Sequence, residues 1–74
     1  MKFLSQMNTG ETAKIKDIIQ VNILTRFREM GLTINSSVQL LGKLPFGGNL
    51  IILSDYGKYT IRKQTAEKIK VDSS

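Results

Sequence analysis

The sequence predicts an all-β domain, a small β-barrel of about five strands with one short helix inserted after the first strand. Apolar and polar residues alternate with a period of two in several short segments, which is typical of half-buried strands. A single segment, residues 22–30, has convincing helical spacing instead. Strands this few and this short would leave exposed edges in a flat sheet, so we expect the sheet to curl into a barrel.

The first ten residues carry apolar side chains at near-helical spacing, and we expect them to form a short flap that closes one mouth of the core. These side chains are Phe3, Leu4 and Met7. The segment Thr12-Ala13-Lys14-Ile15-Lys16 then alternates small or apolar residues with lysine. This pattern predicts a strand with Ala13 and Ile15 facing inward.

The helix is predicted over residues 22–30. Asn22 can cap its first turn through the side-chain oxygen. One apolar stripe follows at i, i+1, i+4 and i+7, formed by Ile23, Leu24, Phe27 and Met30. Arg26 and Arg28 lie in the last turns, where the helix dipole favours cations. Gly31 comes directly after, and glycine takes the left-handed conformation that ends a helix.

After the helix, Asn35 is the residue most suited to a positive φ in a polar connection. Val38-Gln39-Leu40-Leu41 predicts a strand, and the following Gly42 indicates a bulge or bend. Residues 45–49 (Pro-Phe-Gly-Gly-Asn) predict a turn-forming loop.

The last third of the chain predicts two strands of a hairpin and a short closing strand. Residues 50–54 form a nearly continuous apolar run, which predicts a strand buried on both faces, or nearly so. Asp55-Tyr56-Gly57 then predicts the hairpin turn, and residues 58–62 alternate with Tyr59 and Ile61 on one face. Thr65 is expected to cap a single helical turn over residues 66–68. Ile69 and Val71 then form the last strand.

Length and composition point to one small domain that spans residues 1–74. The longest apolar run is far short of the ~20 residues that cross a bilayer. The N-terminal segment also lacks the continuous apolar region of a signal peptide. We therefore expect a cytoplasmic location.

Catalysis and metal binding have few suitable side chains. The sequence contains no histidine and no cysteine. The usual general base at neutral pH is therefore missing, as are the nitrogen and sulfur ligands that ferrous iron and zinc prefer. The acidic residues are spread along the chain and do not form the array of a calcium loop. We expect no catalytic residue, no metal site, no cofactor and no small-molecule substrate, which also argues against a direct iron-binding chaperone.

The net charge of +5 permits a nucleic-acid partner or an acidic protein partner. The lysines are dispersed along the chain, which favours a solvated barrel exterior over a dedicated polyanion site. Tyr56 and Tyr59 flank one hairpin and could stack on bases. A small basic barrel that binds nucleic acid is therefore the alternative to a protein-binding domain.

The loop Leu44-Pro45-Phe46-Gly47-Gly48 is the strongest candidate for a binding segment. An apolar Leu-Pro-Phe at the tip of a glycine loop is costly in water, which suggests either self-packing or a partner. Phe46 can fold back onto the barrel mouth, or it can anchor another protein. The sequence leaves both interpretations open.

Several short motifs, in order from Leu4 to Val71, resemble the ferrous iron transport protein A (FeoA) family. Its helix and stop, Arg-Leu-x-Glu-Leu-Gly-Leu, is similar to Arg26-Phe27-Arg28-Glu29-Met30-Gly31-Leu32. Its closing Arg-x-x-x-Ala-x-x-Ile-x-Val is similar to residues 62–71, from Arg62 to Val71. Two positions differ: Ile34-Asn35 replaces the family's Pro-Gly, and Asn49 replaces a proline after the glycine loop.

The resemblance implies an SH3-like barrel with a helical insertion. It also implies a cytosolic adaptor that binds and modulates FeoB, the membrane GTPase that imports ferrous iron, and that reaches the membrane only through this partner. We expect the contact to be made by the helix and the glycine loop, at Arg26, Arg28, Glu29, Leu44, Pro45, Phe46, Gly47 and Gly48. Arg26 and Glu29 could instead be structural, because residues three apart on a helix can pair.

Overall fold

The computed structural model describes residues 2–19, 24–46 and 48–73 of the chain. Its elements, in chain order, are β1 (Lys2–Phe3), the 3-10 helix η1 (Leu4–Gln6), β2 (Thr12–Ile18), α1 (Leu24–Glu29), β3 (Ser37–Lys43), β4 (Leu50–Ser54), β5 (Gly57–Ile61), α2 (Lys63–Ala66) and β6 (Ile69–Ser73). The predicted all-β class with one inserted helix is confirmed, and the two-residue β1 adds a strand to the five expected.

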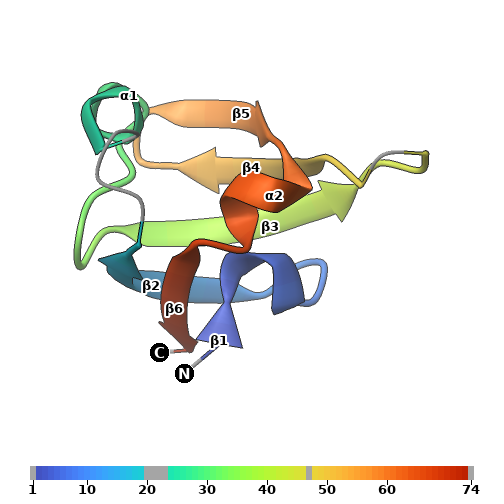
Figure 1. The fold of residues 1–74 in the computed structure, drawn as a ribbon, viewed down its shortest axis with the longest axis horizontal. Helices are drawn as coiled ribbons and strands as arrows, with labels where there is room; N and C mark the ends of the chain where they lie inside the picture. Colours follow the sequence, from blue (N-terminus) through green and yellow to red (C-terminus); the bar gives the residue numbers. More distant parts are fainter. Residues whose placement is uncertain (1, 20–23, 47, 74) are drawn as a thin grey trace.

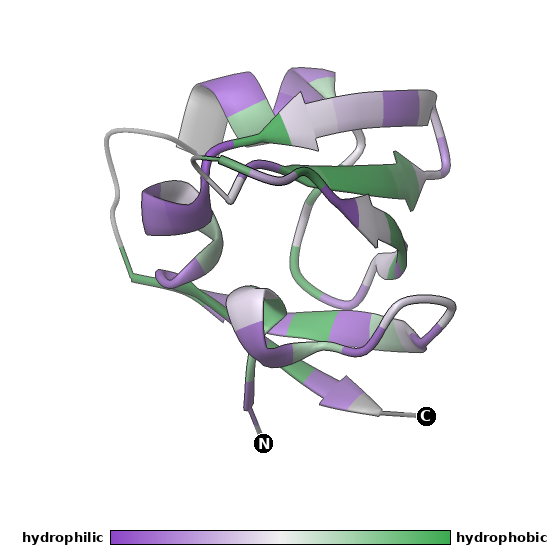
Figure 2. Cartoon of the chain, turned by 90° about the vertical axis from the view of Figure 1, so that its right-hand side faces the viewer, coloured by the Kyte–Doolittle hydropathy of each residue, from purple (hydrophilic) through white to green (hydrophobic). Residues whose placement is uncertain are grey.

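The strands form one antiparallel sheet in the order β1-β6-β2-β3-β4-β5. The sheet curls so that β4 and β5 lie across the interior from β1, β2 and β6 (Figure 1). Along the strands, hydrophobic segments alternate with hydrophilic ones (Figure 2). Because β6 pairs with both β1 and β2, the last strand closes the fold beside the first.

The core follows the alternation of β2, with one interruption. Ala13 and Ile15 are fully buried, as predicted. The register with β6 then shifts between Ile15 and Asp17, which indicates a bulge. An extra residue in one strand moves the following side chains to the opposite face, and for this reason Ile18 is buried as well.

A second bulge lies where Gly42 predicted one. Leu40 pairs with Ile52, whereas Gly42 pairs with Ile51, so the register shifts between Leu40 and Gly42. Strand β3 bends at this point and carries the chain toward the β3–β4 loop. The bend helps the sheet to curl.

Strand β4 corrects one expectation, because it is buried on one face only. Leu50 and Ile52 are buried, whereas Leu53 is 38% exposed. Strand β4 lies between β3 and β5 in the curled sheet, where one face of the sheet meets the core and the other meets solvent. The apolar run of β4 therefore does not indicate that both faces of the strand are buried.

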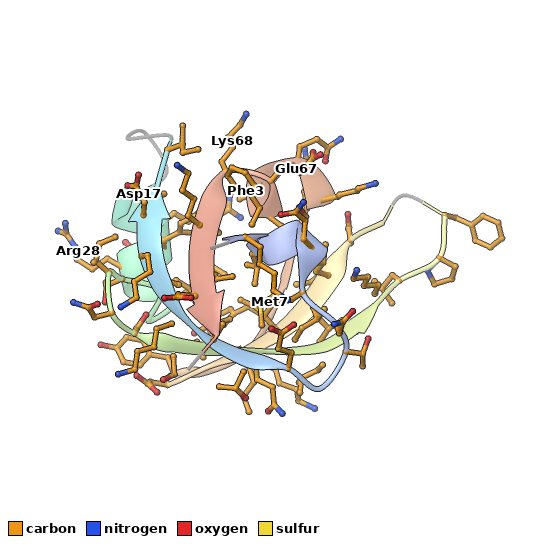
Figure 3. The ribbon with its side chains drawn as sticks, turned by 90° about the horizontal axis from the view of Figure 1, so that it is seen from below. Phe3, Met7, Asp17, Arg28, Glu67 and Lys68 are labelled. Carbon is orange, nitrogen blue, oxygen red and sulfur yellow. The ribbon has the colours of Figure 1, made fainter. Side chains whose placement is uncertain are left out.

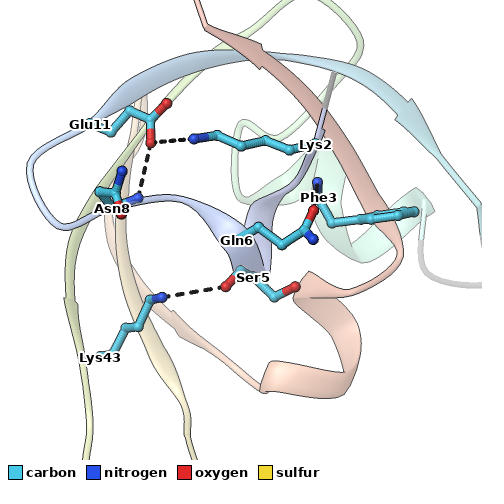
Figure 4. A network of polar contacts seen from close by, with 7 residues as sticks. All are labelled: Lys2, Phe3, Ser5, Gln6, Asn8, Glu11 and Lys43. Carbon is cyan, nitrogen blue, oxygen red and sulfur yellow. Dashed lines mark hydrogen bonds and ion pairs between the residues drawn. The ribbon is translucent and has the colours of Figure 1, made fainter.

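The N-terminal flap closes the core as expected. Leu4 and Met7 are fully buried. Lys2 forms an ion pair with Glu11, 2.8 Å between Nζ and Oε1, and the same carboxylate oxygen accepts the Asn8 N–H (Figure 4). These contacts hold β1 and η1 against the start of β2.

The helix α1 spans six residues, and the predicted cap Asn22 and the start of the apolar stripe at Ile23 lie outside the described residues. Phe27 is 3% exposed, and Met30 packs against the core. Gly31 has a φ of 79°, so the predicted left-handed stop is confirmed.

The helix α2 begins earlier than the sequence predicted. Its N-cap is Arg62, and Thr65 lies inside the helix instead of capping it. Ala66 is fully buried, and its N–H donates to the Arg62 carbonyl. The need to turn Ala66 into the core outweighs the local preference of threonine for a cap position.

Candidate functional site

The β3–β4 loop presents an apolar tip to solvent. Strand pairing ends at Lys43 and Leu50, and the Leu44 N–H donates to the Asn49 carbonyl at 2.7 Å to close the loop. Phe46 has a φ of 53° and is 103% exposed. The interpretation in which Phe46 folds back onto the barrel mouth is therefore wrong, because a residue packed on the barrel would not be fully exposed.

The other residues predicted for this loop are also accessible, as far as the structure describes them. Leu44 is 42% exposed, Pro45 is exposed, and Gly47 lies outside the described residues. Gly48 has a φ of 71°, and a Cβ at this position would lie 3.1 Å from Cδ of Lys63. The base of the loop is therefore in contact with α2.

The charged residues predicted on α1 also point into solvent. Arg26, Arg28 and Glu29 are all exposed. Arg26 and Glu29 form no ion pair in the described part of the chain, where the ion pair found is Lys2–Glu11. The structural role considered for Arg26 and Glu29 is thus not observed, and both remain available to a partner.

The structure does not bring the helix and the loop tip together. Helix α1 and the β3–β4 loop lie at opposite ends of the molecule in two perpendicular views, with Arg28 at the α1 end (Figures 1 and 3). The principal extents of the molecule are 27 × 26 × 22 Å. A partner that contacts both regions must therefore span much of the barrel.

A hollow of about 380 Å³ connects α1 with the base of the loop. It is lined by residues of α1, of the segment from β5 to α2, and of the loop base: Arg26, Phe27, Met30, Asn49, Thr60, Ile61, Arg62 and Thr65. Sequence reasoning selected Arg26 but missed Arg62, Thr60, Thr65 and Asn49 as site residues. Arg62 opens the closing motif of the chain, and this was the one available signal.

The position of α1 is fixed by the β4–β5 hairpin. The Ser54 hydroxyl donates to the Met30 carbonyl at 2.5 Å and accepts the Tyr56 N–H at 3.1 Å. Ser54 is only 8% exposed. The Tyr56 ring also covers Gly31, where an added Cβ would lie 3.0 Å from Cγ of the ring. One wall of the hollow is therefore attached to the sheet by the partly buried Ser54–Met30 hydrogen bond.

Two kinds of feature are absent from the described residues. No helix there is long and apolar enough to cross a membrane. Nor do three or more carboxylate, histidine or cysteine side chains gather in this part of the chain to hold a metal ion. The expectation that the protein binds no metal remains a prediction.

The curled sheet with its helical insertion is that of a small SH3-like barrel. A model of the FeoA domain matches residues 2–73. The chain therefore belongs to the FeoA domain family. No curated protein sequence matches the chain.

Solved structures agree with this assignment. A crystal structure of an iron uptake regulatory protein, FeoA, is 27% identical, with a TM-score of 0.85 over 99% of this chain and 96% of that one. The FeoA of Stenotrophomonas maltophilia, solved in complex with zinc and described as a prokaryotic SH3 domain protein, is 25% identical, with a TM-score of 0.78 over 97% and 91%.

The same fold also occurs within larger proteins. A manganese-dependent transcriptional repressor is 20% identical and has a TM-score of 0.89. The match covers 99% of this chain but only 36% of the repressor. At this identity the similarity concerns the fold alone.

Proposed function

We propose that this protein is a non-enzymatic, cytosolic adaptor of ferrous iron uptake that binds and modulates a FeoB-type membrane GTPase. Membership of the FeoA family supports a role in ferrous iron transport. The S. maltophilia relative is itself described as a candidate ferrous iron transport activating factor. The adaptor acts by protein contact, and it meets the membrane only through its partner.

The observation that carries the proposal is the apolar tip of the β3–β4 loop. A fully exposed phenylalanine next to a 42% exposed leucine has no role in the core. Apolar side chains grouped at an accessible site are typical of protein–protein contacts, and aromatic anchors often supply most of the binding energy. Phe46 is therefore the proposed anchor, with Leu44 and Pro45 beside it.

The direct test is an NMR titration of the isotope-labelled chain with the FeoB-type transporter from the same genome, with guanine nucleotide present. We expect chemical shift changes at residues 44–49. Further changes on α1 would show that this helix, the second predicted contact region, also takes part. An absence of shifts with the full-length transporter would contradict the adaptor proposal. Salt-sensitive binding to generic RNA or DNA in the same experiments would favour the nucleic-acid alternative.

The change Phe46→Ala should weaken transporter binding by about tenfold, as expected for loss of an aromatic anchor. It should change the free energy of unfolding by less than about 0.5 kcal/mol, because an exposed ring contributes little to the core. Calorimetric titration and thermal unfolding measure the two quantities.

Ile34→Ala is the matched control, since Ile34 is a 50% exposed apolar residue in the connection between α1 and β3. It should leave the affinity unchanged. Equal losses of affinity in both variants would show that the contact is not specific to the β3–β4 loop.

A further inference from the structure

We propose that the hollow between α1 and α2 is a carboxylate-binding pocket that receives an acidic side chain from an extended segment of a protein partner. The proposal concerns the pocket around Arg26 and Arg62 and does not depend on which protein is the partner. It differs from the apolar anchor at the loop tip, because the recognition here is by charge and hydrogen bonding.

Two guanidinium groups without a counter-ion are the first reason. Arg26 comes from α1 and Arg62 from the end of β5, and both line the same hollow. The lining contains no Asp or Glu, and neither arginine forms an ion pair within the described residues. A bound carboxylate would give these two charges a counter-ion, and arginine binds carboxylates in a bidentate, charge-assisted manner.

The remaining polar residues of the hollow suit the same ligand. Thr60 and Thr65 place hydroxyl groups, and Asn49 an amide, in the lining. None of these three side chains has a hydrogen-bond partner in the part of the chain that the structure describes. They are therefore available to donate to a carboxylate or to the backbone of a peptide.

The apolar side of the hollow favours a peptide over a small inorganic anion. Phe27, Met30 and Ile61 contribute to the lining, and Met30 is the most accessible of the three because Phe27 is 3% and Ile61 6% exposed. A phosphate ion gains nothing from such a surface, whereas the methylene groups of glutamate and an adjacent apolar side chain bury area against it. The volume of about 380 Å³ is at the lower end of the range for ligand sites, and we infer that it accepts an acidic side chain with one apolar neighbour.

The pocket also lies beside a free strand edge. Strand β5 is the last strand of the sheet order, and Thr60 and Ile61 belong to it. An extended segment can pair its backbone with an exposed edge while alternate side chains enter pockets. The ligand that we propose is therefore an extended, acidic and partly apolar peptide.

The test uses the blocked peptide acetyl-Leu-Glu-Leu-amide and the full chain, followed by NMR, with acetyl-Leu-Gln-Leu-amide as the neutral comparison. We expect saturable shifts at α1, at the end of β5 and at Asn49, with at least about tenfold weaker binding of the glutamine peptide. Equal binding of the two peptides would overturn the proposal. Binding of inorganic phosphate as tight as that of the glutamate peptide would overturn the choice of a peptide.

The variants Arg26→Gln and Arg62→Gln should each lower the affinity for the glutamate peptide by about tenfold. Lys14→Gln is the matched control, because Lys14 is exposed on β2, carries the same charge and does not line the hollow. It should bind the peptide like the unaltered chain. An equal loss in all three variants would show that net charge, not the pocket, governs binding.

Folding of these variants is checked independently of binding. Arg62 is the N-cap of α2 but makes no side-chain capping hydrogen bond, so its replacement removes no cap. Both arginines are exposed and form no ion pair within the described residues, so neither substitution should lower the melting temperature. A loss of peptide binding in a variant with an unchanged melting temperature is therefore a loss of the pocket's own contact. The peptide experiments contain no transporter, so their failure and a failure of the adaptor proposal are distinguishable.

Discussion

At the scale of single residues, Gly31 connects the end of α1 with the β4–β5 hairpin. Its φ is 79°, a conformation that costs other L-residues roughly 1–2 kcal/mol. A Cβ there would also press on the Tyr56 ring, 3.0 Å away at Cγ. Both the backbone and the contact therefore favour glycine at this position.

We expect Gly31→Ala to lower the free energy of unfolding by about 2 kcal/mol, from backbone strain together with displacement of Tyr56. Gly10→Ala is the matched control, because Gly10 has a φ of 90° but no atom within 4 Å of an added Cβ. Its loss should be about 1 kcal/mol, from strain alone. Urea unfolding measures both, and equal losses would show that the Tyr56 contact contributes nothing.

Phe46 and Phe27 show how far residue type alone can mislead. Phe46 follows Leu-Pro and Phe27 stands between two arginines, yet Phe46 is fully exposed and Phe27 is 3% exposed. The helical spacing correctly predicted that Phe27 is buried. For Phe46, the sequence could not decide between packing on the barrel mouth and contact with a partner. The conformation of the β3–β4 loop, which includes a positive φ at Phe46, is not encoded in the hydrophobic pattern.

At the scale of elements, α1 depends on its contacts with the barrel. Its six described residues are too few for an isolated helix to be stable in water. Phe27 anchors it in the core, and Ser54 holds its C-terminal end through the Met30 carbonyl. The helix therefore carries Arg26 to the hollow only while these contacts remain.

Phe27→Leu should lower the free energy of unfolding by about 1–2 kcal/mol, since a smaller side chain leaves part of the core unfilled. Phe46→Leu makes the same chemical change at a solvent-exposed position and should have almost no effect. Thermal unfolding followed by circular dichroism compares the two variants. Similar losses would contradict the assignment of Phe27 to the core and Phe46 to solvent.

The elements themselves were largely predictable. Alternation located β2, β3 and β5, and the glycine at position 42 located a bulge. The start of α2 was wrong because burial of Ala66 outweighed a local cap preference, and β1 was missed because two residues carry no periodicity. The one-sided burial of β4 depends on what covers each face of the sheet, which a single apolar run does not reveal.

At the scale of the whole molecule, the positive charge is spread over the barrel while the two candidate contact regions differ in chemistry. The loop tip is apolar, and the hollow is flanked by Arg26 and Arg62. A net charge of +5 favours association with an acidic partner, and salt screens that attraction. The salt dependence of the affinity therefore distinguishes the contribution of the charged hollow from that of the apolar loop tip.

We expect transporter affinity to fall by about tenfold between about 50 and 300 mM NaCl. Arg62→Gln should make this dependence shallower, whereas Phe46→Ala should lower the affinity equally at every salt concentration. Calorimetric titration at several ionic strengths measures the slopes. A slope unchanged by Arg62→Gln would mean that the hollow does not contribute to this contact.

The sequence by itself determined the class of the fold, the family and most of the element positions, because periodicity, glycine positions and short motifs are local properties of the chain. Only the tertiary structure decided that the helix and the loop tip lie at opposite ends, and that Arg26 and Arg62 share a hollow. These residues are 36 positions apart in the chain, and the curl of the sheet brings their side chains to one cavity. Proximity of this kind arises from long-range strand pairing and core packing, which no local pattern encodes.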